Sequence, residues 1–400
     1  MVKNLKEFAA AQAPCYIYDS RVIKASCLKL KEELADVDFL YSIKANPFEP
    51  LVGLIAALGF GMDAASAGEV MLAKRCGVKS ERIFYSAPGK TEEDIRRTMA
   101  SCTLIADSLH ELELLDKEAK ERGLMLEAGV RVNPSFGMGE EKAASSKFGI
   151  DEELLLRSGA FLSGLKNIKL TGLHVHLKSQ VLDARQLKAY YMNCYHMAAR
   201  LAAALCLDLR FINFGSGIGA VYDELKDKPV ELKELGLTLK QLADLNAQGL
   251  KASFFIETGR YVILQAGAYY TRILDIKESR GIKYLVVAGA MNGFLRPVLA
   301  SLVEGLGIRP SRSLEPLYTS ANAFPLAVLN DEQELEMVDV VGNLCTALDV
   351  IAHGVKLPRA HRGDLIRVGN AGSYSYTLTP LAFSSQQAPG QYLWEHEEDE

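Results

Sequence analysis

The stretch DFLYSIK, residues 38–44, is a short run of mainly apolar and aromatic side chains that ends in a lysine. A run of this length and composition is typical of a buried β-strand. Seven similar runs follow it along the chain, and helical patterns separate them. The eight expected strands are residues 38–44, 61–66, 82–87, 103–108, 129–134, 170–177, 210–215 and 253–260.

Helical periodicity fills the segments between these strands. The expected helices include residues 67–75, 92–99, 110–122, 184–205 and 239–248. Ser108 and Asp183 precede two of them and are expected to act as N-caps, and Gly77 and Gly123 are expected to end two others. The sequence therefore predicts strands and helices in alternation.

This alternation indicates a parallel sheet, and eight units over roughly 230 residues match a (β/α)8 barrel, which typically takes about 250. A doubly wound open sheet is the alternative, but the number of strands weakens it. After residue 260 the chain becomes rich in β-type segments, and CYIY at residues 15–18 could pair with them. We therefore predict an α/β fold, with a TIM-type barrel over residues 22–265 and a C-terminal mostly-β domain formed by residues 1–21 and 266–400.

The composition argues against several classes of protein. The net charge of −5 gives no basis for nucleic-acid binding. The longest apolar run, residues 51–62, is shorter than the about 20 residues that cross a bilayer, and the N-terminus lacks the apolar segment of a signal peptide. Seven scattered cysteines without CxxC spacing, and histidines without HExxH spacing, predict a cytoplasmic protein without disulfides or a metal site.

Functional side chains of such barrels gather where the strands end. Lys44 ends the first expected strand, where partial desolvation would suit a Schiff-base former, although a surface lysine is the alternative. His174 and His176 end the sixth strand and share one face by alternation, although two such histidines are more often satisfied core residues. Glu257 ends the eighth strand and could bind a protonated ring nitrogen or form a surface ion pair.

The segment NFGSGIG, residues 213–219, ends the seventh strand with three glycines. Glycines at this place let backbone N–H groups approach a phosphate, although an ordinary tight turn explains them equally well. A lysine, a histidine that can face a ring, a phosphate loop and an acid are together what pyridoxal phosphate (PLP) requires of a protein. The strand ends therefore predict a PLP site.

Sequence motifs support this prediction along nearly the whole chain, from CYIYD at residue 15 to FSS at residue 383. The motifs are YSIKAN, GMDAASAGE, SAPGKTEEDI, RVNP, SKFGI, GLHVHLKSQ, NFGSGIG, ETGR, MNGFLRP, GNLCTALD and GDLIRVGNAGSYSY. As an ordered set they resemble the fold-type III PLP decarboxylases, which include diaminopimelate, ornithine, arginine and carboxynorspermidine decarboxylases. The resemblance implies a PLP-binding barrel followed by a β domain, in agreement with the pattern of elements.

The resemblance also implies roles for individual residues. Lys44 matches the lysine that holds PLP covalently, and His176 matches the histidine that stacks on its ring. Glu257 matches the acid that pairs with the pyridine nitrogen. Cys345 matches the cysteine that the other subunit of a homodimer contributes, and that donates a proton after CO2 leaves. The matched phosphate-side positions are Ser179, Gly217, Gly259, Arg260 and Tyr374, and supporting rim positions are Asp63, Arg131 and Asn133.

The residue after this cysteine departs from the family pattern. Diaminopimelate and ornithine decarboxylases carry an acid there, which holds the distal ammonium of the substrate, whereas this chain has Thr346. An unpaired buried charge costs several kcal/mol, so a simple diamino substrate is not expected. The family tyrosine four residues after Arg296 is Ala300, which enlarges the pocket. A family glycine is replaced by Lys178, which could add a cation for the substrate or lie in solvent at the rim.

These departures predict the class of substrate. Arg260, Arg296, Thr346 and Tyr374 are the predicted substrate-binding residues, since the two arginine positions grip a distal carboxylate in the diaminopimelate enzymes. The Cys-Thr-x-x-Asp form resembles family branches in siderophore and secondary-metabolite pathways, which act on citryl-amino acids or carrier-bound aminoacyl groups. The predicted substrate is therefore a small-molecule amino-acid conjugate with a distal carboxylate. A citryl-amino acid of siderophore biosynthesis is the specific prediction.

Three other functions fit parts of the sequence. One is a meso-diaminopimelate decarboxylase of lysine biosynthesis. Another is an alanine-racemase-like enzyme on the same fold, although the Cys345 and Tyr374 motifs match the decarboxylases. The third is a non-catalytic PLP-fold regulator, which retention of Lys44, Glu257 and Cys345 disfavours.

Overall fold

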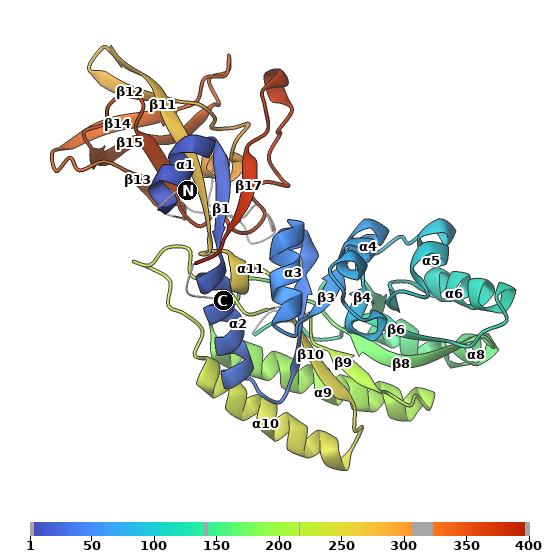
Figure 1. Cartoon of the computed structure of the whole chain (residues 1–400). Coiled ribbons are helices and arrows are strands. Elements are labelled where there is room, and N and C mark those ends of the chain that lie inside the picture. The colour runs from blue at the N-terminus through green and yellow to red at the C-terminus, as the bar shows by residue number, and fades with distance from the viewer. Residues whose placement is uncertain (1–3, 140–142, 216, 306–322, 397–400) are drawn as a thin grey trace. The chain divides into compact units, whose positions relative to one another are not determined.

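The computed structural model describes residues 4–139, 143–215, 217–305 and 323–396. The chain divides into two compact units (Figure 1). The barrel unit comprises Ser26–Ala220 and Pro229–Tyr261, and the β-rich unit comprises Met1–Ala25, Val221–Lys228 and Val262–Glu400.

Eight parallel strands of the barrel unit close into a ring. They are β2 (Asp38–Ser42), β3 (Gly61–Ala64), β4 (Ile83–Tyr85), β5 (Thr103–Ala106), β6 (Leu126–Asn133), β8 (Ile168–His174), β9 (Phe211–Asn213) and β10 (Ser253–Thr258). Each strand pairs with the next in this order, and β10 pairs with β2. A further short strand, β7 (Ile150–Asp151), pairs with β6. The predicted barrel is confirmed.

The eight strands end one to three residues before their predicted ends. The hydrogen-bonded ladder stops there because the chain bends away from the sheet at the carboxyl ends of the strands. Residues that were predicted as strand ends, Lys44 and His176 among them, therefore lie in the turns and loops that follow.

Helices surround this ring (Figure 1). They include α2 (Ser20–Glu33), α3 (Glu49–Ala57), α4 (Ala67–Arg75), α5 (Glu92–Thr98), α6 (Leu109–Glu121), α7 (Glu152–Arg157), α8 (Gly159–Gly164), α9 (Ala184–Leu205) and α10 (Leu232–Gln248). A short helix, α11 (Arg260–Ile263), follows β10. The side chains of Ser108 and Asp183 accept the backbone N–H groups of Glu111 and Arg185, so both predicted N-caps are confirmed.

The predicted start of α10 was wrong, because the helix begins seven residues earlier, at Leu232 rather than at residue 239. Gly236 lies inside the added turns, and a Cβ there would lie 2.1 Å from the carbonyl oxygen of Glu33 at the end of α2. The glycine therefore permits two helices to approach closely. Sequence patterns alone treat such a glycine as a helix breaker.

Aromatic and aliphatic side chains fill the interior of the barrel. Leu40, Phe84, Ile105, Phe211 and Phe255 form one buried cluster from five different strands. A Cβ on Gly172 of β8 would lie 2.0 Å from the Phe211 ring, so that position must be glycine for the ring to fit. Because the interior is packed, chemistry in this unit is confined to the strand ends.

The β-rich unit contains β1 (Cys15–Asp19), β11 (Gly267–Ser279), β12 (Ile282–Val287), β13 (Leu326–Val328), β14 (Leu335–Val341), β15 (Val350–Pro358), β16 (Leu365–Val368) and β17 (Gly390–Trp394), with helices α1 (Leu5–Gln12) and α12 (Leu295–Gly305). β1 pairs antiparallel with β11 and parallel with β17. The N-terminal strand thus pairs with the C-terminal β region, as the sequence predicts.

The segment Val221–Lys228 groups with the β-rich unit, although it lies within the residues that the sequence assigns to the barrel. The Asn370 side chain donates to the Tyr222 carbonyl oxygen at 3.1 Å, and Arg296 donates to the Tyr222 hydroxyl at 3.0 Å. Polar contacts from residues distant in sequence hold this segment, so local sequence patterns could not place it.

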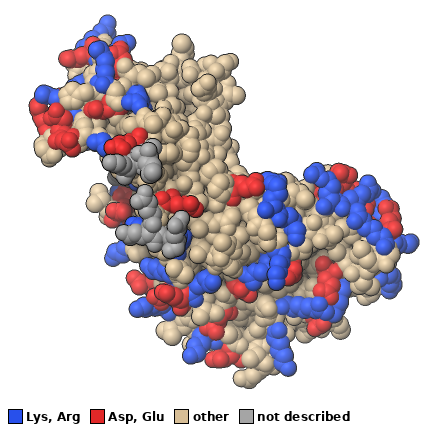
Figure 2. Space-filling view, in the orientation of Figure 1, with Lys and Arg blue, Asp and Glu red and all other residues tan. Residues whose placement is uncertain are grey.

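The surface carries both signs of charge. Figure 2 shows basic and acidic side chains interspersed over the barrel unit on the face drawn, in keeping with the small net charge of −5. Among the helices that the structure describes, none combines the length and the apolar character needed to cross a bilayer.

Candidate active site

Lys44 and Asp63 form an ion pair where β2 and β3 end. Lys44 lies in a short 3-10 helix, Ile43–Ala45, directly after β2, and its Nζ is 3.0 Å from Oδ2 of Asp63. The Asp63 side chain is fully buried and also accepts hydrogen bonds from Ser42 at 3.0 Å and Ser86 at 2.7 Å. The Lys44 side chain is 44% exposed. The lysine therefore presents a tethered but accessible amine.

Glu257 lies in β10 within a buried polar cluster. Its Oε1 is 3.0 Å from Nε2 of His174 and accepts a hydrogen bond from Nδ2 of Asn213 at 2.9 Å. Burial disfavours the ionised carboxylate, but the charge and hydrogen bond of His174 outweigh it and hold the pKa of Glu257 below its usual range. An ionised carboxylate at this position suits a protonated ring nitrogen.

His176 follows β8, which ends at His174. The prediction that the strand extends through His176 was therefore wrong, because His176 lies in the loop that follows it. Desolvation, together with the nearby cations of Arg131 and Lys44, lowers the pKa of His176 to about 3 against the opposing effect of Glu257. The imidazole is thus neutral at pH 7.

Two glycine positions that follow the strand ends lie close to neighbouring side chains. A Cβ on Gly217 would lie 2.8 Å from Cδ2 of Leu187, and a Cβ on Gly259 would lie 2.9 Å from Cβ of Ala45, the neighbour of Lys44. Ser179 lies near His176, with its Oγ 3.4 Å from the ring Nε2. Arg260 follows Gly259 as the first residue of α11 and is buried. These phosphate-side predictions thus fall at the ends of β8, β9 and β10.

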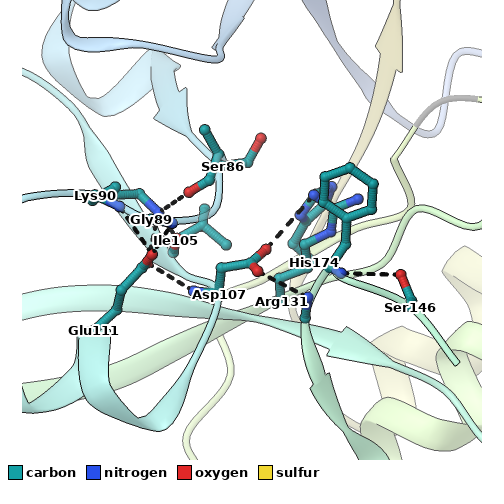
Figure 3. Close-up of polar contacts among 12 residues, drawn as sticks. Ser86, Gly89, Lys90, Ile105, Asp107, Glu111, Arg131, Ser146 and His174 are labelled. Carbon is teal, nitrogen blue, oxygen red and sulfur yellow. Dashed lines mark hydrogen bonds and ion pairs between the residues drawn. The ribbon is translucent and has the colours of Figure 1, made fainter.

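Arg131 and Asp107 join a second polar network, which the sequence did not reveal (Figure 3). The Arg131 guanidinium is 3.7 Å from Asp107 and lies over the Phe148 ring. Glu111 accepts the backbone N–H of Asp107 at 2.9 Å and pairs with buried Lys90 at 2.8 Å. Arg131 was predicted as a supporting rim position from the motif resemblance, but no sequence signal pointed to its pairing with Asp107 or to the pair Lys90–Glu111.

Asn133 and Glu69 also belong to the sequence motifs of the rim. Asn133, predicted to support the rim, donates to Asp151 of β7 at 2.8 Å and to the Ala144 carbonyl oxygen at 3.2 Å, so its described side-chain contacts lie between β6 and α7. Glu69, in α4, was not predicted. Burial raises the pKa of Glu69 to about 7, and the nearby Asp63 carboxylate adds to the effect.

Cys345 and Thr346 lie in the loop between β14 and β15 of the β-rich unit. Cys345 is an exposed free thiol. The Thr346 hydroxyl accepts the backbone N–H of Leu348 at 3.3 Å, which closes a tight turn. The buried carboxylate of Asp349 accepts N–H groups from Leu344 at 2.8 Å and from Met291 at 2.7 Å. Asp349 thus fixes the loop that carries the cysteine.

Arg296 and Tyr374 also lie in the β-rich unit. Arg296 is fully buried, donates to the Ser373 carbonyl oxygen at 3.0 Å, and packs against the rings of Tyr222 and Phe324. Tyr374 follows Ser373 and adopts a left-handed backbone conformation, with φ of 52°. Arg296 therefore supports the backbone beside Tyr374 in this structure.

The strand ends of the barrel unit present the donor set that PLP requires. They provide an accessible amine at Lys44, a neutral imidazole at His176 and an ionised carboxylate at Glu257. The residues present therefore fit the predicted cofactor.

Comparisons with known proteins agree with this fit. The family model "Pyridoxal-dependent decarboxylase, pyridoxal binding domain" matches residues 20–264. The chain is 28% identical over 390 residues to a diaminopimelate decarboxylase of Aquifex aeolicus, covering 94% of this chain and 86% of that protein. It is 28% identical over 391 residues to an L-glutamyl-[BtrI acyl-carrier protein] decarboxylase of Niallia circulans, covering 96% and 89%.

The crystal structure of diaminopimelate decarboxylase from Helicobacter pylori complexed with L-lysine is similar in fold, with a TM-score of 0.82 at 25% identity, covering 96% of this chain and 92% of that one. The sequence matches confirm the predicted cofactor, PLP, and the predicted reaction class, decarboxylation of an amino-acid substrate. The chain belongs to the family of pyridoxal-dependent decarboxylases.

Proposed function

We propose that this decarboxylase removes the α-carboxylate of an amino-acid conjugate that carries no free distal ammonium, with a citryl-amino acid of siderophore biosynthesis as the first candidate. Thr346 carries the proposal. It stands where relatives that act on diamino substrates have an acid, and its hydroxyl already accepts the Leu348 N–H. A neutral, engaged hydroxyl cannot balance a desolvated ammonium.

Asp349 is the only carboxylate in the described loop 342–349, and it does not replace the missing acid. It is 3% exposed, and both of its oxygens accept backbone N–H groups. Turning it toward a substrate would leave the N–H groups of Met291 and Leu344 without this acceptor, at a cost of about 1–3 kcal/mol each if they stay buried. The loop therefore offers no ready partner for a second amine.

The proposal also includes a distal carboxylate on the substrate. Support for this part comes from the family resemblance at Arg260 and Arg296. The structure adds no support for it, because both side chains are buried. Lys178, near the end of β8, is half-buried and could add a cation.

We assign the chemistry of the site to the following groups. PLP, when bound, supplies an electron sink for the carbanion that CO2 loss leaves behind. Lys44 anchors it, His176 contacts its ring face and Glu257 keeps the ring nitrogen protonated. Ser179, Gly217, Gly259, Arg260 and Tyr374 bind its phosphate, and Asp63 orients Lys44. Cys345 delivers a proton to the substrate carbon.

Similarity to known proteins supports two candidate substrates. The Niallia circulans relative is named for a glutamyl group held on a carrier protein, which is a conjugate. Several relatives are named as diaminopimelate decarboxylases, so meso-diaminopimelate is the second candidate. We further propose a cytoplasmic homodimer with shared active sites, supported by the family resemblance and by the exposed Cys345 thiol.

A substrate panel with CO2 detection tests the proposal. It contains meso-diaminopimelate, ornithine, lysine, citryl-serine and citryl-diamine conjugates. We expect turnover of a conjugate and little of meso-diaminopimelate. Fast turnover of meso-diaminopimelate would overturn the argument from Thr346. No CO2 from any substrate, with no change of visible absorbance on borohydride treatment, would favour the regulator.

A Thr346→Glu variant sharpens this test. The added carboxylate can pair with a distal ammonium, so we expect kcat/KM for meso-diaminopimelate to rise by at least about tenfold, which corresponds to 1.4 kcal/mol. Thr346→Val is the matched control, since it keeps the shape without a charge. An equal response of both variants would contradict the assigned role of position 346.

A further inference from the structure

Gln180 clamps together two loops of the barrel unit. Its side-chain amide donates to the carbonyl oxygen of Ala220, and its side-chain carbonyl accepts the N–H of the same residue at 3.1 Å. One side chain thus satisfies both backbone groups of Ala220, as a neighbouring strand would. The clamp joins the loop after β8 to the loop after β9.

Backbone hydrogen bonds continue this contact between the two loops. Val181 donates to Gly217 at 2.9 Å and accepts from Gly219 at 2.9 Å, and it forms an isolated parallel bridge with Ile218. A Cβ on Gly219 would lie 3.0 Å from the carbonyl carbon of Gln180, so the loops are too close there for a side chain. The Gln180 side chain extends the short ladder by one residue.

The backbone of Gln180 is itself unusual. Its φ is 59°, in the left-handed region that costs a residue with a side chain about 1–2 kcal/mol. Such a conformation persists only where the surroundings require it. The two bonds to Ala220 supply that requirement, because they fix the direction in which the side chain must point.

The clamp lies between two proposed phosphate positions. Gln180 directly follows Ser179, and the ladder that it extends includes Gly217. After Ala220 the chain leaves the barrel unit. The clamp therefore fixes the end of the glycine loop to the barrel unit, directly before the segment 221–228 that groups with the β-rich unit.

We propose that Gln180 is a positioning residue for the cofactor phosphate, fixing the separation of Ser179 from Gly217 without contacting the phosphate itself. This inference rests on the phosphate-side roles assigned under the proposed function, but not on the identity of the amino-acid substrate.

The test compares binding of PLP with binding of pyridoxal, which lacks the phosphate, by titration of the apoprotein. Gln180→Met removes both bonds to Ala220 and keeps the length of the side chain. We expect its dissociation constant for PLP to rise about tenfold, because PLP binding must then order the loop that one to two net hydrogen bonds held before. The dissociation constant for pyridoxal should change less than about twofold. Pyridoxal binds every part of the site except the phosphate positions. A general loss of structure would therefore lower the affinity for both ligands.

Two further variants keep the outcome interpretable. Gln180→Gly relieves the backbone strain and also lacks the clamp, so it should fold well and still lose PLP affinity selectively. Gln186→Met makes the same substitution on α9, where the side-chain amide donates a long hydrogen bond of 3.5 Å to Asp183, and should bind both ligands as wild type does.

The inference is overturned if both Gln180 variants bind PLP as wild type does, or if PLP and pyridoxal affinities fall together. A different substrate in the CO2 panel would contradict the proposed function but leave this result unaffected. The two failures are therefore distinguishable.

Discussion

Lys44 is the residue on which the proposed chemistry depends, and its charge already has a buried partner in Asp63, 3.0 Å away. Lys44→Arg keeps a cation opposite Asp63 but cannot condense with an aldehyde. We expect a folded protein that gains no PLP mass on borohydride reduction and releases no CO2. Lys74→Arg on α4 is the control and should label normally. A reduced PLP adduct on the Lys44→Arg chain would place the covalent link elsewhere.

Glu69 gives the rim a pH-dependent stability. Burial raises its pKa to about 7, against about 4.3 in an unfolded chain. Between these values the folded protein keeps a proton that the unfolded chain has released, so this group lowers stability as pH rises from about 4 to about 7. Glu69→Gln cannot ionise, and its free energy of unfolding relative to wild type should rise across this window.

Urea denaturation at a series of pH values measures this difference. Glu153→Gln, at an exposed glutamate, is the control and should follow wild type throughout. A constant difference between Glu69→Gln and wild type from pH 4 to pH 7 would show that Glu69 is ionised in the fold.

Among single residues, the sequence predicted those whose side chains are typical of PLP chemistry. Lys44, His176 and Glu257 were predicted from their place at strand ends together with the motif resemblance, and their roles stay predictions. Gln180 was not singled out, because its role depends on where Ala220 lies after folding. No local pattern encodes a contact across 40 residues.

The loop between β4 and α5 is held by the buried pair Lys90–Glu111. Nζ of Lys90 also donates to the carbonyl oxygens of Ala87 at 2.5 Å and Ile105 at 2.6 Å. Lys90→Met leaves the Glu111 carboxylate and both carbonyl groups without this donor, so we expect a loss of about 3–5 kcal/mol of stability. Urea denaturation measures it.

The exposed pair Lys117–Glu92 provides a matched control for this variant, with a distance of 2.6 Å. Lys117→Met should cost less than about 1 kcal/mol, as exposed pairs do. Equal losses of unfolding free energy in the two variants would show that the buried pair contributes no more to stability than the exposed pair.

The elements themselves were largely predictable. Eight apolar runs separated by helical patterns gave the barrel, because each strand is buried on both faces and therefore reads as continuous apolar sequence. The early start of α10 and the short strand β7 were missed. Both depend on a close approach between segments, at Gly236 and beside β6, rather than on their own composition.

For the whole molecule, the proposed homodimer makes a quantitative prediction. Lys44→Arg and Cys345→Ala variants should each be inactive or nearly so alone. If each site combines Lys44 of one chain with Cys345 of the other, random mixing gives mixed dimers in about half of the molecules, each with one intact site. Activity should then recover to about a quarter of wild type.

Mixing after mild dissociation and reassociation, followed by CO2 release, measures the recovery. Mixing either variant with itself is the control. No recovery, with mixed dimers demonstrated by mass, would mean that both residues serve the site of their own chain.

The path of the backbone limits how this enzyme can be dissected. Because Val221–Lys228 belongs to the β-rich unit and α10 returns to the barrel, a single cut near residue 265 does not yield two self-sufficient fragments. The N-terminal fragment would retain Tyr222 but lose Arg296 and Asn370, which hold it. Chimeras between relatives should therefore exchange residues 1–25, 221–228 and 262–400 together, because these three stretches of the chain form one unit.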